Sequence, residues 1–462
     1  MPQPAFAFHF TQALLPGGWA RDVRVEGAGG VITRITAGTP ARSGDERHAI
    51  ALPGLPNLHS HAFQRGMAGL GEVKGAGPDS FWTWREVMYR FLERLGPEDM
   101  HAIAAMAYIE MLETGFTRVG EFHYLHHAPD GTPYANRAEM ACALAAAAQE
   151  TGIALSLLPV FYAHSGFGGQ APGAGQRRFV TSLDSYAALR ESAAAALAGL
   201  PDAVLGMAPH SLRAATPEEL RALLALDGAC PVHIHIAEQT AEVEACEAWS
   251  GARPVAWLLG EMPVDARWCL VHATHMTPAE TAALAASGAV AGLCPITEAN
   301  LGDGLFPAVD YLAAGGRWGV GSDSNVLIDA AEELRWLEYG QRLALRGRNL
   351  LAGAPGARSG AALLAGALAG GGQALGAEAA LGAGAEAALA VGAAADFVTL
   401  AADHPSLACR EGEALADGWI FAAGRAGVAG VWRRGVQLVA QGRHRARGAV
   451  EARYRAALAR LV

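Results

Sequence analysis

Short apolar runs alternate with amphipathic, Ala- and Leu-rich segments along most of the chain. The apolar runs have the length and the β-branched or aromatic content of strands, and they cover residues 117–122, 154–162, 204–211, 231–239, 269–275, 290–296 and 318–325. Residues 216–228 and 240–251 are typical of the helical segments between them. With an earlier strand that ends in "LPNLHSH", this alternation predicts parallel βαβ units closed into a (β/α)8 barrel.

The two ends of the chain have a different pattern. Strand-like segments separated by Gly and Pro cover residues 5–10, 22–27, 30–38, 394–400 and 427–444. We therefore predict an α/β fold in which a TIM-type barrel is inserted in a small β-sandwich formed by both chain ends. The predicted limits are 1–52 and 385–450 for the sandwich, 53–384 for the barrel and 451–462 for a C-terminal helix. Residues 352–392 are a low-complexity Ala/Gly segment, for which we expect helices without a specific role.

Composition and charge narrow the class of protein. The chain has 462 residues, 52% of them hydrophobic and 17% charged, which is typical of a globular protein with a large core. A net charge of −10 and scattered Lys and Arg argue against a nucleic-acid partner. No segment has the pattern of a signal peptide or a membrane span. The six cysteines lie far apart without a C-x-x-C motif, so we expect reduced thiols and a cytoplasmic enzyme.

The stretch "LPGLPNLHSHAFQRG" places His59 and His61 one residue apart. On a strand, side chains at i and i+2 point to the same face, so both imidazoles could bind one metal ion. Two polar residues in a loop after a Pro-rich run would give the same letters. The pair alone therefore leaves a metal site and a plain loop open.

A second pair of histidines ends the apolar strand "VHIHIAEQ". His233 and His235 alternate on this strand, and Glu238 follows three residues later. Burying such groups costs free energy unless they are paired or bound to a metal. One histidine is enough as a ligand, and we expect His233 to be a hydrogen-bonded core residue. Glu238 is a candidate general acid/base beside a metal.

Two further polar residues follow later strands in the same way. His272 ends "LVHATH", and Asp323 lies in "VGSDSN". An aspartate between Gly and Ser is by itself typical of a turn. Active sites of (β/α)8 barrels are built at the C-terminal ends of the strands, so these side chains are expected at one rim with the histidines above.

The ordered set H-x-H, H-x-x-E, H and D resembles the amidohydrolase superfamily, metal-dependent hydrolases and deaminases on a (β/α)8 barrel. The resemblance covers essentially the whole chain. It implies His59, His61, His235 and Asp323 as ligands of one divalent metal ion, with zinc as the default and iron as an alternative. It also implies Glu238, His272 and Asp323 as catalytic residues. No lysine ends an early strand as a bridging ligand, and Glu121 and His123 occupy that region, which favours one metal.

Within the superfamily, the motifs are most similar to those of the formimidoylglutamate deiminase family. They are "HSHAFQRGMAG", "FWTWRE", "GEFHYLHH", "MAPHSLRA", "HIHIAEQ" and "CPITEANLGDG". This resemblance implies hydrolysis of N-formimino-L-glutamate to N-formyl-L-glutamate and ammonia, a step of histidine degradation, and a homodimer. A dicarboxylate substrate needs cations, for which Arg85 and Arg213 are the candidates, with hydrogen bonds from Gln64, Tyr124 and His210.

Other functions remain open at this point. Guanine deaminase and imidazolonepropionase would share the metal site but need different substrate contacts. A non-catalytic scaffold barrel usually lacks ligands, whereas every expected ligand is present here. No role is assigned to His123, His126, His127 or His164. The Gly-rich loop 164–179 could be a lid, and it lacks the G-K-[ST] ending of a phosphate-binding loop.

Overall fold

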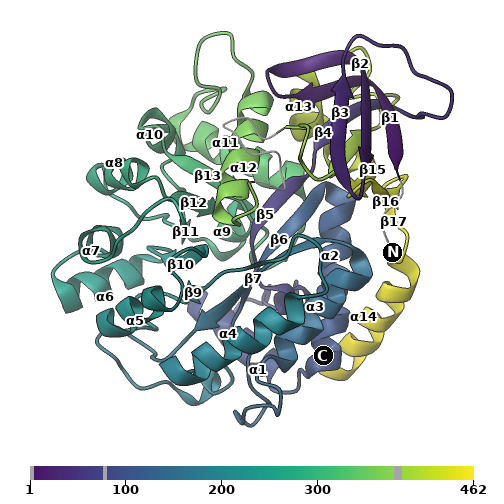
Figure 1. The fold of residues 1–462 in the computed structure, drawn as a ribbon. Helices are drawn as coiled ribbons and strands as arrows, with labels where there is room; N and C mark the ends of the chain where they lie inside the picture. The colour runs from purple at the N-terminus through teal and green to yellow at the C-terminus, as the bar shows by residue number, and fades with distance from the viewer. Residues whose placement is uncertain (1–4, 76, 78–80, 379–387) are drawn as a thin grey trace.

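A computed structural model describes residues 5–75, 77, 81–378 and 388–462. The element labels below are those of Figure 1. Within this part of the chain, a barrel of parallel strands surrounded by helices lies beside a sheet built from both chain ends (Figure 1). The predicted sandwich and barrel limits near 385 fall outside the described residues. None of the described helices combines the length and apolar character needed to cross a bilayer.

Eight strand positions form the barrel. In order they are β5 (Leu55–Ser60), β6 (Phe116–His123), β7 (Ala154–Phe161), β8 (Val204–Leu205) with β9 (Ala208–Pro209), β10 (Val232–Ile236), β11 (Trp268–His272), β12 (Val290–Leu293) and β13 (Arg317–Val320). Two hydrogen-bonded sheets, β5 to β8 and β10 to β13, contain them. Parallel bridges from Met207 to Val232 and from Ser60 to Asp323 join the sheets into a closed ring. The prediction of a (β/α)8 barrel is confirmed.

Helices follow most of these strands and cover the outside of the barrel (Figure 1). They include α2 (Pro97–Thr114), α3 (Glu139–Thr151), α4 (Leu183–Leu197), α5 (Pro217–Leu226), α6 (Thr240–Ser250), α7 (Pro254–Glu261), α8 (Pro278–Ser287), α9 (Pro295–Leu301), α10 (Ala308–Ala313) and α11 (Ala330–Leu345). Local sequence explains several starts. Thr216 and Thr277 accept a hydrogen bond from the backbone of Glu219 and Glu280, and proline occupies the first helical turn in both cases.

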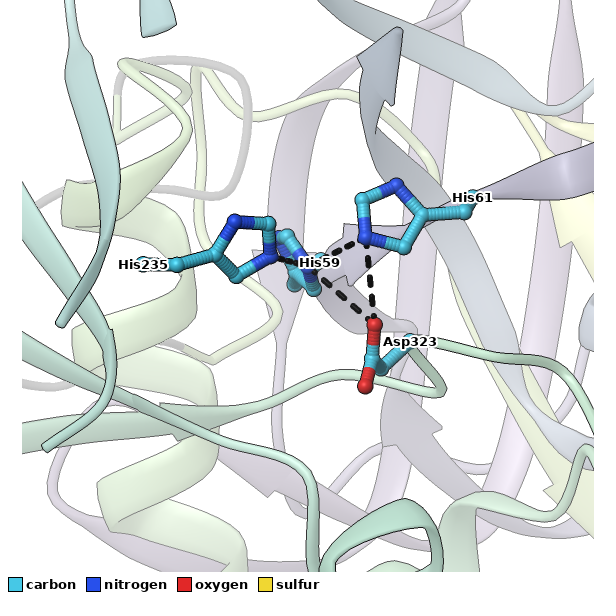
Figure 2. A group of neighbouring side chains, drawn as sticks. All are labelled: His59, His61, His235 and Asp323. Atoms are coloured by element: carbon cyan, nitrogen blue, oxygen red, sulfur yellow. Dashed lines mark hydrogen bonds and ion pairs between the residues drawn. The ribbon is translucent and has the colours of Figure 1, made fainter. Parts of the chain in front are cut away.

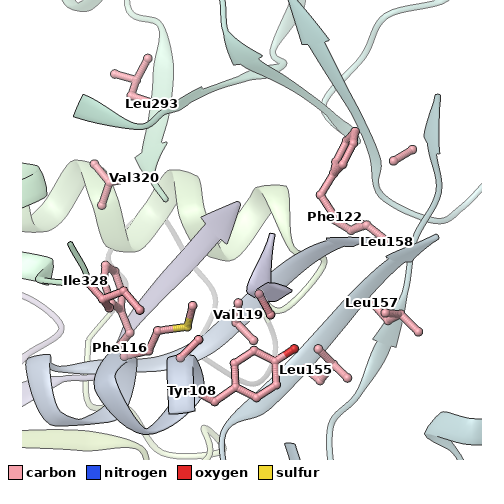
Figure 3. Close-up of a cluster of buried hydrophobic side chains, with 14 of the residues drawn as sticks. Tyr108, Phe116, Val119, Phe122, Leu155, Leu157, Leu158, Leu293, Val320 and Ile328 are labelled. Carbon is pink, nitrogen blue, oxygen red and sulfur yellow. The ribbon is translucent and has the colours of Figure 1, made fainter. Parts of the chain in front are cut away.

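The barrel strands are buried on both faces, as expected for parallel strands covered by helices. Every residue of β5, β6, β7, β10 and β11 is buried. Figure 3 shows part of the core, with Val119 of β6 and Leu155 of β7 near Tyr108 of α2. The predicted strand 204–211 is not continuous. It contains two short strands, β8 and β9, which pair separately with β7.

The chain ends form one eight-stranded sheet, in the order β17-β16-β15-β14-β4-β1-β2-β3. Its strands are β1 (Phe6–Leu15), β2 (Gly18–Ala28), β3 (Val31–Thr36), β4 (Glu46–Pro53), β14 (Phe397–Leu400), β15 (Val428–Arg433), β16 (Val436–Ala440) and β17 (Arg443–His444). All pairs are antiparallel except β1 with β4. An aromatic cluster of Phe8, Phe10, Phe397 and Trp432 supplies its core, with Phe397 stacked on Trp432 at 4.9 Å. α14 (Arg447–Leu461) closes the chain.

The low-complexity segment has a role that the sequence did not indicate. Its helix α12 (Ser359–Ala374) packs on β5, β12 and β13 at the barrel end opposite the strand C-termini, and Ala374 and Leu375 are fully buried. A Cβ atom on Gly370 would lie 1.9 Å from the carbonyl oxygen of Trp318. Glycine is therefore required for this close approach. The helix α12 closes this end of the barrel and is part of its core.

Candidate active site

His59, His61, His235 and Asp323 converge at the C-terminal rim of the barrel (Figure 2). The Nε2 atom of His59 lies 3.2 Å from that of His61 and 3.0 Å from that of His235. Oδ1 of Asp323 lies 3.3 Å from Nε2 of both His59 and His61. The four donor atoms lie within 4.8 Å of one another, and all four residues are buried.

Hydrogen bonds from the far side of the rings direct the lone pairs into this cluster. Nδ1 of His61 lies 2.9 Å from the carbonyl oxygen of Phe122, and Nδ1 of His235 lies 3.1 Å from that of His210. A carbonyl only accepts, so both Nδ1 atoms carry the proton and both Nε2 atoms keep a lone pair. The ring of Phe122 packs against His235 at 4.4 Å and supports the cluster from one side.

The cluster fits a small cation. Burial lowers the pKa of His59 to about 3 and also lowers the pKa values of His61 and His235, so the imidazoles are neutral near pH 7. The lone pairs of His61 and His235 and the carboxylate of Asp323 face one another around Nε2 of His59 and repel unless a positive charge lies between them. Ligands bound at about 2.0–2.1 Å around a tetrahedral ion lie roughly 3.3 Å apart, which agrees with the distances here.

Glu238 and His272 lie beside this cluster. Nε2 of His272 is 3.8 Å from the Glu238 carboxylate, and its Nδ1 donates to Oε1 of Glu298 at 3.3 Å. Burial raises the pKa of Glu238 to about 7, against the opposing effects of His272 and Arg213. Burial would lower the pKa of His272, but the carboxylates of Glu238, Glu298 and Asp323 outweigh it and raise the pKa to about 10. His272 is thus a charged donor next to a carboxyl group that titrates near neutrality.

Backbone strain accompanies these residues. His272 has φ of 69° and Asp323 has φ of 43°, and Ala237 beside Glu238 has φ of 49°. Residues other than glycine seldom adopt such angles, and they persist where surrounding contacts enforce them. Glu242 provides such contacts, because its two carboxylate oxygens accept from the backbone N–H groups of Ala237 and Glu238, each at 3.2 Å.

A pocket that is partly open to solvent connects the cluster with every predicted substrate-binding residue. Gln64 donates to the Tyr124 hydroxyl at 2.8 Å, and the Oε1 atom of Gln64 is buried without a partner among the described residues. The His210 ring lines the same pocket and lies 4.9 Å from the ring of His235.

Arg85 and Arg213 carry the unpaired charge of the pocket. Neither guanidinium has an ion pair or hydrogen bond within the described residues, and the Nε atoms of both are buried. Their guanidinium carbons lie 4.5 and 5.8 Å from the ring centroid of Trp82, so both lie near the same aromatic ring. Two such cations close together without a counter-ion favour an anionic ligand.

The family models agree with this site. Residues 50–438 match the Amidohydrolase family, and residues 6–49 match the N-terminal domain of formimidoylglutamate deiminase HutF. The chain belongs to the amidohydrolase family. This family is metal-dependent, and the buried His/Asp cluster is the corresponding candidate metal site of the chain.

Two similar proteins match this chain over nearly its whole length, and a third matches about two thirds of it. A formimidoylglutamate deiminase of Pseudomonas aeruginosa is 53% identical over 435 residues, 94% of each chain. The crystal structure of an amidohydrolase from Brucella melitensis has a TM-score of 0.94 and 55% identity, and the match covers 99% of both chains. A 5-methylthioadenosine/S-adenosylhomocysteine deaminase of Natronomonas pharaonis is more distant, with 29% identity over 64% of this chain and 63% of the other.

The remaining histidines of this amidohydrolase have structural partners in most cases. His233, which we expected in the core, bonds the carbonyl oxygen of Ala374 at 2.7 Å. His126 and His127 bond main-chain carbonyl oxygens, and His164 pairs with Glu219 at 2.9 Å. His123 is buried, and its Nε2 atom has no partner among the described residues.

Several pocket residues of the amidohydrolase were not predicted. They are Phe81, Trp84, Met88 and Tyr89 of α1 (Phe81–Leu92), together with Tyr162, Phe179 and Leu301. Phe179 ends the Gly-rich loop 164–179, and Gln176 of the same loop donates to the Tyr162 hydroxyl at 2.5 Å. Apart from the aromatic run in "FWTWRE", no local signal separates these residues from ordinary core positions. Glu298 was also missed, although it lies in the quoted motif "CPITEANLGDG".

Proposed function

We propose that the chain catalyses the hydrolytic deimination of N-formimino-L-glutamate, in which water adds to the formimino carbon and ammonia leaves to give N-formyl-L-glutamate. The observation that carries this proposal is the pocket that joins the His/Asp cluster and Glu238 to two arginines, for which the described part of the chain supplies no ion-pair partner. A substrate with a hydrolysable C–N group at one end and two carboxylates at the other matches this arrangement. The 53% identical deiminase supports the same activity.

His59, His61, His235 and Asp323 would hold one divalent ion, and zinc suits three imidazoles and a carboxylate. The ion would supply Lewis-acid activation of water near neutral pH. Asp323 has a second role in the proposal, since its carboxylate also accepts a hydrogen bond from the attacking water and orients it. Bonds from Nδ1 to main-chain carbonyl oxygens hold His61 and His235 in place.

Glu238 transfers the proton in this proposal. It takes a proton that the water releases and delivers it to the departing nitrogen, a role that suits a carboxyl group with a pKa of about 7. His272, held by Glu298, donates a hydrogen bond to the oxygen that develops negative charge. The 3.8 Å separation of Glu238 and His272 keeps both groups at the same reacting carbon.

The two arginines of the pocket bind the glutamate part. Arg85 and Arg213 each offer a planar fork that matches a carboxylate. Gln64, Tyr124 and His210 complete the hydrogen bonds, and the unpartnered Oε1 of Gln64 is free to accept from a substrate N–H group. Guanine deamination would use the same cluster, but a neutral base would leave both arginines without a counter-ion, and this argues for the dicarboxylate.

The test is ammonia release by the metal-loaded protein with N-formimino-L-glutamate and with guanine, together with a separate measurement of imidazolonepropionate consumption, because opening of that ring releases no ammonia. We expect turnover of the first alone. Release from guanine but not from N-formimino-L-glutamate would establish the alternative, and a protein with about one metal ion per chain but no turnover of any of the three would favour a scaffold.

We also propose the domain limits, the oligomeric state and the location of the protein. The chain folds as a sandwich domain (1–52 and 385–450), a barrel domain (53–384) and a terminal helix (451–462). The end of β4 at Pro53 and the start of β5 at Leu55 support the first boundary. The protein is a homodimer, which light scattering checks. It is cytoplasmic, which cell fractionation checks; all six cysteines are free thiols.

A further inference from the structure

We propose that Asn57, Ser322 and Asn325 form a buried polar latch that closes the barrel between its first and last strands and thereby positions the metal ligands. The proposal rests on the metal site of the proposed function. It assigns a role to three residues that do not line the pocket and that carry no charge. They act through the ligands, so they are positioning residues.

The place where β5 meets the segment after β13 is here called the seam. Only the bridge between Ser60 and Asp323 pairs the strands there within the described residues. The N–H of His61 donates to the Asp323 carbonyl, and the N–H of Asp323 donates to the His59 carbonyl, both at 2.9 Å. Three of the four proposed ligands are therefore on the seam, two on one side and one on the other. Its geometry sets their mutual distances.

The two strands also approach unusually closely at the seam. A Cβ atom on Gly321 would lie 2.7 Å from both the backbone N and the carbonyl O of His59. Real side chains do not tolerate such contacts, so glycine is required at this position. The residues of the seam are buried, so protein groups supply the hydrogen bonds of the backbone here.

The latch begins with a reciprocal pair. Nδ2 of Asn57 donates to the Ser322 hydroxyl at 2.7 Å, and the Ser322 backbone N–H donates to Oδ1 of Asn57 at 3.1 Å. The Ser322 hydroxyl then donates to Oδ1 of Asn325 at 2.6 Å. Asn57 belongs to β5, and Ser322 and Asn325 follow β13. The three side chains thus connect both sides of the seam and are fully buried.

Asn325 completes the latch beside the ligands. Its Nδ2 lies 3.1 Å from each of three acceptors, the Ser60 hydroxyl and the carbonyl oxygens of His61 and Asp323. One amide group therefore contacts the main chain of a ligand on each side of the seam. Asn325 has φ of 54°, an angle that asparagine tolerates better than most residues.

Loss of the Asn325 amide removes one of two donors from the carbonyl groups of His61 and Asp323 and leaves the buried Ser322 hydroxyl without its acceptor. This costs free energy, which the seam recovers by opening to water. An open seam separates His59 and His61 from Asp323. Metal binding and seam closure then stabilise each other, since a coupling between two events acts equally in both directions. Groups that orient metal ligands in this way typically contribute 10- to 100-fold to metal affinity.

The variant Asn325→Gly tests this proposal, because glycine keeps the positive φ and removes only the amide. We expect its zinc dissociation constant to rise about 10- to 100-fold, with an altered absorption spectrum of the cobalt-substituted protein. Hydrogen exchange at the N–H groups of His61 and Asp323 should be faster than in the parent protein.

Gln373→Ala is the matched control. Gln373 is another buried amide that joins neighbouring strands, because its Nε2 donates to the carbonyl oxygens of Ala266 and Gly288 at 2.8 and 2.9 Å. These acceptors precede β11 and β12, at the barrel end away from the cluster. We expect Gln373→Ala to lower thermal stability and to leave zinc affinity and the cobalt spectrum unchanged.

Ser322→Ala gives the same test if Asn325→Gly does not fold. It removes the hydroxyl between the two amides and leaves the three contacts of Asn325 Nδ2 in place. We therefore expect the zinc dissociation constant to rise, but by less than in Asn325→Gly. Zinc affinity equal to that of the parent in the folded latch variants would overturn the proposal and leave the proposed function intact. A parent protein that binds no metal would instead refute the proposed metal site, and the positioning role with it.

Discussion

The carboxylate of Glu238 lies 3.8 Å from Nε2 of His272, at the edge of the His/Asp cluster. The two side chains come from the ends of neighbouring strands, β10 and β11, and both are buried. Both pKa values are raised, to about 7 for the acid through burial and to about 10 for the imidazole through the neighbouring carboxylates, which outweigh burial. A carboxyl group that exchanges protons near neutrality therefore stands beside a charged hydrogen-bond donor.

Glu238→Gln should lower kcat about 100- to 10,000-fold, because the amide cannot take up and deliver a proton. Metal content should stay at the parent value, since Glu238 is outside the cluster of donor atoms. Steady-state kinetics with parallel metal analysis check this. Activity close to that of the parent would show that another group carries the proton.

The pH profile of kcat/KM should fall on the acidic side below about pH 7, the pKa of Glu238. Below that value the carboxyl group is protonated and cannot accept a proton from water, so the rate drops about tenfold per pH unit. The profile must be measured at constant metal loading, because acid also protonates the histidines. A rate independent of pH between about 6 and 8 would contradict the assignment.

Arg85→Ala and Arg213→Ala should each reduce kcat/KM for N-formimino-L-glutamate by about 30- to 1,000-fold, which corresponds to about 2–4 kcal/mol for lost charged hydrogen bonds. Arg→Lys at either position keeps the charge but not the fork and should recover part of the loss. The control is Arg221→Ala, an arginine whose partner Glu261 lies on the surface. Unchanged turnover in Arg85→Ala would remove that residue from the carboxylate site.

His235→Ala should abolish metal binding and activity, whereas His233→Gln on the same strand should retain both. Only His235 reaches the cluster, while His233 bonds the carbonyl oxygen of Ala374, which the glutamine amide can also reach. Chelation of the parent protein should reproduce the first result and lower its Tm, because a ligand bound only to the native state stabilises it. Metal analysis and thermal unfolding are the measurements, and retained metal in His235→Ala would refute its role as a ligand.

Gly370→Ala should destabilise the fold by about 1–3 kcal/mol or more, because the new methyl group overlaps the carbonyl of Trp318. Gly260→Ala, also within a helix, has no neighbour within 4 Å of the added atom and should stabilise by about 0.5–1 kcal/mol. Urea denaturation of both variants separates close packing from helix propensity. Equal effects of the two substitutions would show that α12 does not need glycine at this contact.

Much of the site could be predicted from the local sequence pattern. His59, His61, His235, Glu238, His272 and Asp323 each follow or end an apolar run, and a barrel brings all strand C-termini to one rim. The residues of the pocket walls could not be predicted as well from the sequence. Phe179 lines the pocket with Tyr162 and Arg213 although it lies at the end of the loop 164–179, and an aromatic residue in a loop has no distinctive periodicity.

The order of strands and the types of donor side chain were determined by the sequence itself, since alternation and buried polar residues are local properties. Tertiary structure alone decided which donors meet. His233 and His235 point to the same barrel face with the same chemistry, yet one bonds the end of α12 and the other reaches the cluster. Their depth along the barrel axis separates them, and that depth depends on contacts with chain segments more than a hundred residues away.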